Sequence, residues 1–338
     1  MHSLLCLFAL AMSSMDDPKL DGPLHMSREK AYKLEITLTE TLTGQEVDPP
    51  KWLVNAPMLP SYDAQTVHKA SFYIPTETQL RTSYPKDKSG QLQPYMSIQF
   101  AHPTSRPITA QAIYELTTYK RKLTSGASPE KPFPLGNQKL FYTANHPWLD
   151  LDKPAFKDWL KEEKLIKNPG ESDIKFAWRA FKEISIFFQY DPEAEGLNPL
   201  SVIGQKTSNT LGLATLYMAV LRSQDIPARY VVSMPLQEFK DQENQVMDTR
   251  LHEETADVLV EFWAEDIGWV PTDIVRAAGF HEPSELFGNA EGNFAAYHFD
   301  MIQYEKGKYT FLDRMDWSTN LDVANAKVKR KVEFRKLD

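Results

Sequence analysis

The stretch that most constrains the fold of this chain runs from Ser208 to Val232 and reads SNTLGLATLYMAVLRSQDIPARYVV. Large apolar residues recur in it at helical spacing, at Leu213, Leu216, Tyr217, Val220 and Leu221. Alanine and methionine occupy the opposite face, so the predicted helix is apolar nearly all round and belongs in a core. Ser208 or Asn209 is positioned to cap its start. Pro227 prevents further helix, and Tyr230 begins a predicted strand.

This helix, turn and strand resemble those of the transglutaminase-like superfamily, whose members are related to papain-type cysteine peptidases. In that family a Gly-x-Cys turn opens the helix, and the strand follows a GIPAR-like segment, which is Ile226–Arg229 (IPAR) here. Alignment on this segment and on Ala214 puts the nucleophilic cysteine of the family at Thr210 and its glycine at Ser208. The resemblance therefore implies a scaffold for cysteine chemistry in which threonine replaces the nucleophile.

A second segment carries the same resemblance. The predicted strand DVLVEFW, from Asp257 to Trp263, is followed by GWVPTD, from Gly268 to Asp273. The two resemble the HAW-E strand and the GW-x-x-x-D strand of the family. Aligned on the glutamate and on the Gly-Trp pair, the histidine of the family falls on Asp257, whereas its aspartate is kept as Asp273. We interpret Trp263 and Trp269 as core residues or as walls of a binding groove.

The chemistry of the family needs all three side chains, because the thiolate attacks, the imidazole moves the proton and the carboxylate orients the imidazole. Here the three positions are Thr210, Asp257 and Asp273, and a threonine hydroxyl is a poor nucleophile without a base. His252 lies five residues before Asp257, which is roughly 16 Å along an extended strand and on its opposite face. We therefore interpret Thr210 as a helix-start residue and the two aspartates as carboxylates at strand ends. His146 is interpreted as a solvated or structural histidine.

The first residues form a short apolar run, HSLLCLFALAMSS, and residues 1–15 resemble a secretory signal peptide. The run is too short to span a bilayer, so no transmembrane span is predicted. Its Cys6 is the only cysteine of the chain. Removal of the run would leave no thiol, which excludes disulfides, cysteine-ligated zinc and a thiol nucleophile. We expect a secreted or periplasmic protein.

The predicted fold class is α+β, with a papain-like transglutaminase core, a helix packed on an antiparallel sheet, preceded by an all-β sandwich-like domain. The predicted division is an N-terminal β domain over residues 24–125, a linker over 126–145, a transglutaminase-like domain over 146–285 and a C-terminal β extension over 286–338. Strands are expected at residues 31–42, 70–74, 95–101 and 110–119. Helices are expected from Pro154 and over residues 171–190, with a connecting turn over residues 201–207.

The formal net charge of −8 argues against nucleic acid as a partner, because no basic field is present to attract phosphate. The leading hypothesis is a pseudoenzyme that has lost thiol chemistry and binds or scaffolds peptide, glycopeptide or protein ligands. The alternative is an active hydrolase or acyltransferase that uses Thr210, Asp257 and Asp273 in place of Cys-His-Asp.

Two further hypotheses remain open. No cofactor is predicted, although two carboxylates at Asp257 and Asp273 would favour a bound cation if they meet, and calcium is the plausible ion outside the cytoplasm. The second of these hypotheses is a structural or assembly role in which the β domain makes the contacts.

Overall fold

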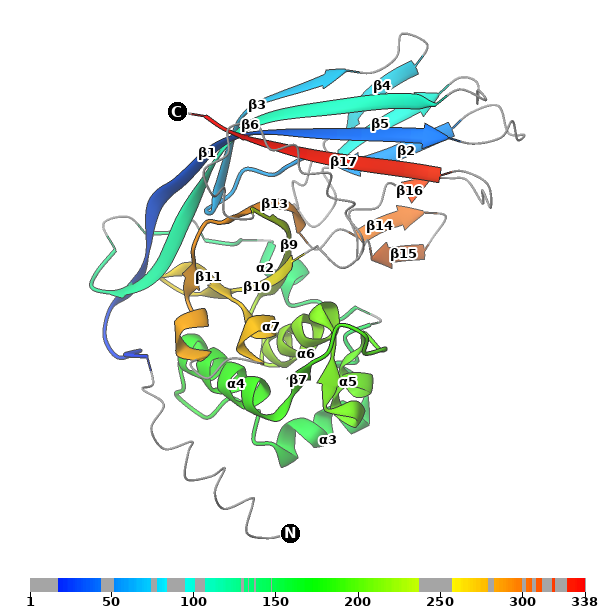
Figure 1. Cartoon of the computed structure of the whole chain (residues 1–338). Coiled ribbons are helices and arrows are strands. Elements are labelled where there is room, and N and C mark those ends of the chain that lie inside the picture. The colour runs from blue at the N-terminus through cyan, green and yellow to red at the C-terminus, as the bar shows by residue number, and fades with distance from the viewer. Residues whose placement is uncertain are drawn as a thin grey trace.

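The structure is a computed structural model of the whole chain. It describes residues 18–43, 52–73, 78–83, 95–100, 107–128, 131–132, 134–136, 138–146, 148–236, 257–278, 283–299, 302–305, 308–311, 318–319 and 327–337. The predicted signal segment with Cys6, and His252, lie outside these ranges. The fold class is α+β, as predicted, with antiparallel sheets on one side and helices on the other (Figure 1).

The largest sheet has five strands and joins segments from both ends of the chain. Its strand order is β12-β6-β1-β17, with β3 also paired to β6. The strands are β1 (Leu24–Thr43), β3 (Gln65–Tyr73), β6 (Ile108–Ser125), β12 (Asn289–Ala290) and β17 (Lys327–Lys336). Alternation makes β1 two-faced, because Leu34, Ile36 and Leu38 are buried while the residues between them are partly exposed. The predicted strands over residues 31–42 and 110–119 are confirmed, and both extend further.

A second antiparallel sheet has four short strands in the order β16-β2-β5-β4. These are β2 (Trp52–Pro57), β4 (Thr78–Ser83), β5 (Tyr95–Phe100) and β16 (Ser318–Thr319). A separate hairpin consists of β14 (Ile302–Glu305) and β15 (Lys308–Phe311). The two larger sheets outside the core are therefore antiparallel, and they combine strands that precede the core with strands that follow it.

The core sheet has the order β11-β10-β9-β13 and is antiparallel throughout. Its strands are β9 (Ala228–Pro235), β10 (Asp257–Ala264), β11 (Gly268–Thr272) and β13 (Phe294–Phe299). The helices are α2 (Gln138–Tyr142), α3 (Pro154–Glu162), α4 (Asp173–Phe187), α5 (Pro199–Gln205), α6 (Thr210–Arg222), α7 (Ile274–Ala277) and η2 (Pro283–Leu286). The short parallel pair β7 (Gln189–Tyr190) and β8 (Thr207–Ser208) leads into α6.

The core sheet lies between the helices and the five-stranded sheet (Figure 1). Successive residues of β10 serve the two sides in turn. Val258, Val260 and Phe262 belong to the cluster that holds α4 and α6, whereas Leu259 packs with Phe294 and Phe299 on the other side. Helix α6 is buried over its whole length from Gly212 onward, as predicted for a helix that is apolar all round.

The expected turn over residues 201–207 is wrong, because helix α5 occupies most of it. The side chain of Asn198 accepts a hydrogen bond of 2.9 Å from the backbone N–H of Ser201, and Pro199 fills the first helical position. Lys206 ends the helix in the left-handed conformation, with φ of 59°. An Asn-Pro pair is a start signal for a helix and could have identified α5 from the sequence.

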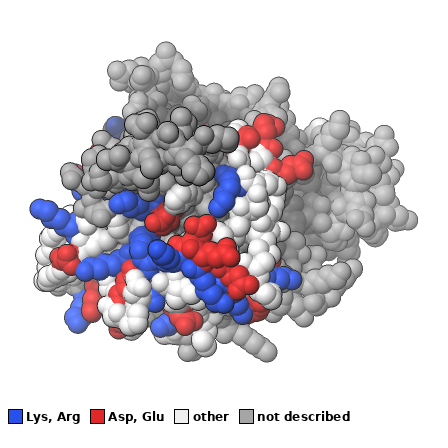
Figure 2. Space-filling view, turned by 90° about the horizontal axis from the view of Figure 1, so that it is seen from below, with Lys and Arg blue, Asp and Glu red and all other residues white. Residues whose placement is uncertain are grey.

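Strands from the end of the chain are shared among the sheets, since β12 and β17 join the five-stranded sheet and β13 joins the core sheet. The division of the chain into four segments stays a prediction. On the helical side, Lys and Arg lie among Asp and Glu, so that no single sign of charge dominates the described part of this face (Figure 2). Among the described residues, no helix has the length and apolarity needed to cross a bilayer.

Candidate functional site

Helix α6 begins at Thr210, and the segment before it is fixed by Asn209. The side chain of Asn209 accepts a hydrogen bond of 3.0 Å from the backbone N–H of Gly212 and donates one of 3.0 Å to the carbonyl oxygen of Ala194. Asn209, and not Ser208, is thus the N-cap. Thr210 itself is partly exposed, whereas Ser208 is fully buried. Position 210 therefore lies at the accessible end of a buried helix.

Ser208 has an unusual environment for a serine. Its backbone carbonyl accepts a hydrogen bond of 2.9 Å from the N–H of Asp191, but its buried hydroxyl oxygen has no hydrogen-bond partner in the described part of the chain. The hydroxyl occupies space beside the Cα of Gly212, where a β-carbon would overlap it. Ser208 thus fills a gap at the start of α6 and is not accessible to a substrate.

Asp273 follows β11 and caps the short helix α7. Its side chain accepts a hydrogen bond of 3.0 Å from the backbone N–H of Arg276, and the Arg276 guanidinium lies 3.7 Å from the other carboxylate oxygen. The carboxylate is buried, with 5 % of the residue exposed. The kept aspartate therefore follows the end of β11 and is engaged at a helix start.

Asp257 is the first residue of β10 and pairs with Ser233 of β9. On its other side β10 pairs with β11, and Val260 lies opposite Thr272. If that register continues by one residue, Asp273 lies opposite Leu259 of β10. Leu259 is two residues from Asp257, or roughly 7 Å along β10. The backbones of the two aspartates are thus brought to neighbouring strand ends.

Contacts of helix α6 tie it to the same strands. The Thr215 hydroxyl, in the second turn of α6, lies 2.7 Å from the Tyr230 hydroxyl of β9. Tyr230 pairs with Val260 of β10, and Val260 pairs with Thr272 of β11. The three positions assigned by the resemblance therefore come from α6, β10 and the end of β11, which pack on one another.

Trp263 and Trp269 lie at the other end of the β10–β11 pair. They face each other in the register, with ring centroids 5.7 Å apart and planes at 78°. Trp263 is six residues beyond Asp257, or roughly 20 Å along the strand. Both tryptophans line a cavity of about 640 Å³ there. If they form a groove wall, the groove is distant from the start of β10.

A buried ionic cluster connects the core sheet to the five-stranded sheet, and sequence analysis did not predict it. Glu261 of β10 binds two arginines, Arg229 of β9 at 2.9 Å (Nε) and 2.6 Å (Nη2), and Arg121 of β6 through its other oxygen. Arg121 also donates to the carbonyl oxygen of Trp269. Burial raises the pKa of Glu261, but the charges of Arg229 and Arg121 outweigh it and lower the pKa below its usual value.

Aromatic rings surround the second arginine of this cluster. The guanidinium carbon of Arg229 lies 4.0 Å from the ring centre of Trp269 and 4.3 Å from that of Phe299. The two aromatic rings stabilise the positive charge of Arg229. Among the described residues, Arg229 has one carboxylate partner, Glu261, which it shares with Arg121. Arg229 belongs to the IPAR segment and Glu261 to the strand motif. Both residues served the alignment, yet only the structure gives them a role as a buried pair.

His146 lies in a loop and is largely shielded from solvent. Its ring stacks on Trp148 at 4.9 Å, with planes 9° apart. Burial, followed by the positive charge of Arg222, lowers its pKa to about 4. It is therefore a neutral structural histidine at neutral pH, and it lies far along the chain from all three positions assigned by the resemblance.

The chemistry available at these positions is limited. Thr210 offers a partly exposed hydroxyl, and Asp273 offers a carboxylate already bound to helix α7. In the part of the chain that the structure describes, no three His, Cys, Asp or Glu side chains gather as metal ligands would. The helix and strands that carry the three assigned positions are thus present, but these positions hold neither a thiol nor an imidazole.

Comparison with known proteins agrees with this architecture. Residues 166–274 match the sequence profile of the transglutaminase-like superfamily. No match is found among curated proteins. A candidate cysteine protease from Cytophaga hutchinsonii has a similar fold, with a TM-score of 0.56 and 14 % identity over 93 % of each chain.

The periplasmic domain of TgpA from Pseudomonas aeruginosa aligns with a TM-score of 0.35 and 14 % identity, over 72 % of this chain and 75 % of that one. The matched segment, residues 166–274, contains α4, α6 and the β9, β10 and β11 strands. The chain therefore carries a domain of the transglutaminase-like superfamily.

Proposed function

We propose that this protein is a catalytically inactive member of the superfamily that binds peptide, glycopeptide or protein ligands outside the cytoplasm. One observation carries the proposal. Within a domain that matches the family, the helix-start position holds Thr210 and the strand-start position holds Asp257, so that neither thiol nor imidazole stands where the resemblance requires it. Without both groups, the proton transfer that activates a cysteine nucleophile has no pathway.

The environment of Asp273 supports the same conclusion. A carboxylate that orients a catalytic imidazole uses its oxygen atoms for that hydrogen bond. Here one oxygen accepts from the N–H of Arg276, and the other faces the Arg276 guanidinium. The residue serves local structure, while the buried helix and sheet that form the scaffold are complete. Such a scaffold retains a surface for binding after its chemistry is lost.

The alternative is an active hydrolase or acyltransferase, and the exposure of Thr210 is the observation in its favour. A nucleophile must reach its substrate, and Thr210 is partly exposed at the start of α6. Asp257 would have to act as its base, which requires a carboxylate pKa raised well above its usual value. The leading proposal does not need that shift.

One experiment separates the two. Peptide hydrolysis and amine transfer are measured for the wild type, Thr210→Ala and Asp257→Ala, with the exposed Thr109→Ala on β6 as the matched control. We expect no turnover above buffer for any of them, together with equilibrium binding of at least one peptide or glycopeptide. Binding should weaken when Thr210→Arg adds bulk at the start of α6. Turnover that disappears in Thr210→Ala but persists in Thr109→Ala would establish the alternative.

Calcium is the cofactor to add as one arm of this experiment, because two carboxylates near each other attract a cation. If the backbones of Asp257 and Asp273 bring their side chains together, calcium should raise the thermal midpoint and a chelator should lower it. Secretion is tested separately, by the N-terminal sequence of the protein recovered outside the cells. We expect residues 1–15 to be absent from it.

A further inference from the structure

The cavity lined by Trp263 and Trp269 is a separate feature from the start of α6. Its walls come from five parts of the chain: the start of β1, Asp63 before β3, Arg121 of β6, the segment over residues 128–138, and the β10–β11 turn. None of Thr210, Asp257 and Asp273 lines it. Its volume of about 640 Å³ lies in the range of small-molecule sites. We propose that this cavity binds a carboxylate group carried on an apolar body.

The first step in the argument is the charge of the lining. Among the described residues that line the cavity, Arg28, Arg121 and Lys131 are cations, and Asp63 is the one carboxylate. Glu261 lies behind Arg121 and is shared with Arg229, so a single carboxylate balances two buried arginines. The buried cluster therefore keeps one excess positive charge, which favours an anion in the cavity beside it.

The second step is that the existing carboxylates compensate this charge weakly. Asp63 lies 3.8 Å from Arg121, but its side chain is 59 % exposed, whereas that of Arg121 is 2 % exposed. The pair of Lys131 and Asp266, at 3.4 Å, is exposed on both sides. Exposed ion pairs are screened by water and contribute little. The Arg28 guanidinium, 3.5 Å from the ring centre of Tyr119, donates to the Thr66 hydroxyl and has no carboxylate partner among the described residues.

The third step concerns the rest of the ligand. Met26, Pro132, Pro134 and Leu135 line the cavity together with the two tryptophans. Such walls bind apolar or aromatic groups and leave small inorganic anions without contacts. Guanidinium groups also match the two oxygens of a carboxylate in geometry. The lining thus selects an organic acid, such as an acylated amino acid or the C-terminus of a peptide.

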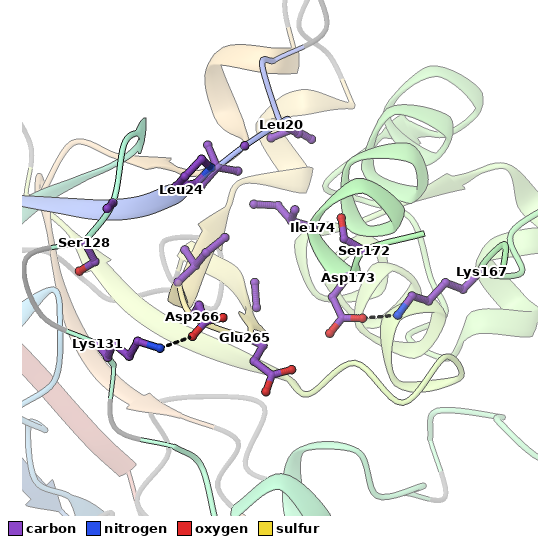
Figure 3. A pocket seen from close by; sticks show the side chains of 15 residues that line it. Leu20, Leu24, Ser128, Lys131, Lys167, Ser172, Asp173, Ile174, Glu265 and Asp266 are labelled. Atoms are coloured by element: carbon purple, nitrogen blue, oxygen red, sulfur yellow. Dashed lines mark hydrogen bonds and ion pairs between the residues drawn. The ribbon is translucent and has the colours of Figure 1, made fainter. Parts of the chain in front are cut away.

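The neighbouring cavity, of about 650 Å³, provides a contrast. It shares Lys131 with the first, but among the described residues that line it, three carboxylates outnumber two lysines. Figure 3 shows Asp266 paired with Lys131, Asp173 paired with Lys167, and Glu265 between the two pairs. An anion would be repelled there. The proposed ligand should therefore bind on the tryptophan side of Lys131.

The test uses two probes that differ only in charge, N-acetyl-leucine and N-acetyl-leucinamide, with calorimetric titration of the full chain. We expect the acid to bind at least about tenfold more tightly than the amide, as charge-assisted hydrogen bonds imply. The free acid and the amide of Ala-Ala-Leu form a second pair, which distinguishes a peptide C-terminus from a free acylated amino acid.

The variants Lys131→Gln and Arg28→Gln should each weaken acid binding about two- to fivefold, and Trp263→Ala should weaken binding of both probes. Lys157→Gln, an exposed lysine of α3, is the matched control and should bind as the wild type does. Equal affinity for acid and amide, no binding of either up to about 10 mM, well above the Kd of a weak ligand, or unchanged affinity in both charge variants would overturn the proposal. The two proposals are distinguishable, because binding at the start of α6 should respond to Thr210→Arg, whereas binding in this cavity should respond to Lys131→Gln and Arg28→Gln.

Discussion

The hydroxyl oxygen of Ser208 occupies the space that a β-carbon at Gly212 would need. Such a carbon would overlap the hydroxyl, and it would also lie 3.0 Å from the carbonyl oxygen of Gly196 and 3.2 Å from a methyl group of Val202. In the aligned family the earlier position is glycine. A serine at position 208 thus requires a glycine at position 212. This explains why the first turn of α6 contains glycine, a residue that disfavours helix.

Gly212→Ala is therefore expected to destabilise the protein, although alanine favours helix by about 1 kcal/mol over glycine. The overlap with Ser208 forces a shift in a packed region, and overpacking of this kind costs about 1–3 kcal/mol. Urea unfolding measures the net effect. In the background Ser208→Gly, the cost should shrink, since the main obstacle is gone. An equal cost in both backgrounds would show that the two residues are not coupled.

Glu261→Gln should be among the most destabilising single changes in the core. It leaves Arg229 buried without its carboxylate and leaves Arg121 with only the exposed Asp63, 3.8 Å away. Breaking a buried ion pair from one side costs about 3–5 kcal/mol. The measurement is the free energy of unfolding in urea. Glu265→Gln, in the turn after β10, is the control, because Glu265 is exposed and should change stability by less than about 0.5 kcal/mol. A small effect at Glu261 would mean that the arginines find other partners.

The same carboxylate predicts a loss of stability in acid. The pKa of Glu261 in the folded protein lies below its ordinary value, because the two arginines outweigh its burial. The stability it contributes is therefore complete above the unfolded pKa of about 4.3 and is lost as the pH falls through the folded value. The urea midpoint should therefore be measured from about pH 5 down to about pH 3, a range that brackets the unfolded pKa. As the pH falls, the midpoint should decrease more steeply for the wild type than for Glu261→Gln. Parallel curves would contradict the assignment.

His146 predicts a separate loss at higher pH. Burial and the charge of Arg222 lower its pKa to about 4, against about 6.5 in an unfolded chain. A lowered histidine pKa means that the unfolded state gains a proton first, so stability falls from about pH 6.5 down to about pH 4, by at most about 3 kcal/mol. His146→Gln should flatten the stability curve in that window, while Glu261→Gln should leave that part of the curve unchanged.

Thr210→Cys should produce a reactive thiol. In the background Cys6→Ser it is the only cysteine, since the natural chain has one. It lies partly exposed at the start of a thirteen-residue helix, where the helix lowers a thiol pKa, so alkylation should be up to about tenfold faster than at an exposed Thr109→Cys control. Addition of Asp257→His should accelerate it again. Equal rates at positions 210 and 109 would show that the start of α6 no longer activates a nucleophile.

Much of the fold could be predicted from local pattern. The apolar periodicity from Leu213 to Leu221 and the Pro227 break defined α6 and β9, and Pro154 marked the start of α3. Strand ends were predicted less well, because β1 and β6 continue through polar residues such as Lys30 and Lys120. Lys30 pairs with Tyr119 and Lys120 with Glu29, so the pairing of the two strands, and not apolar contacts, extends them. Such pairing joins residues about ninety positions apart, and a local window does not contain it.

The site was predictable only as far as the resemblance extends. It placed position 210 at a helix start, and the structure agrees. It gave no indication that Glu261 binds Arg121, because the two residues are 140 positions apart and on different sheets. The separation of Trp263 from Asp257 could have been inferred from strand rise alone. The partner of Asp273, Arg276, was visible in the sequence as an N-cap pattern that opens a short helix.

Pairing of β17 with β1 has a consequence for biosynthesis. Leu34 pairs with Lys336, so an early strand is completed by a strand that is made 302 positions later. Throughout most of translation, the edge of β1 that β17 will cover stays open, and an open edge invites pairing with other chains. Nascent copies on one polysome would thus present the same unpaired strand to each other, and the yield of folded protein should depend on chaperones that shield this strand until β17 has been made.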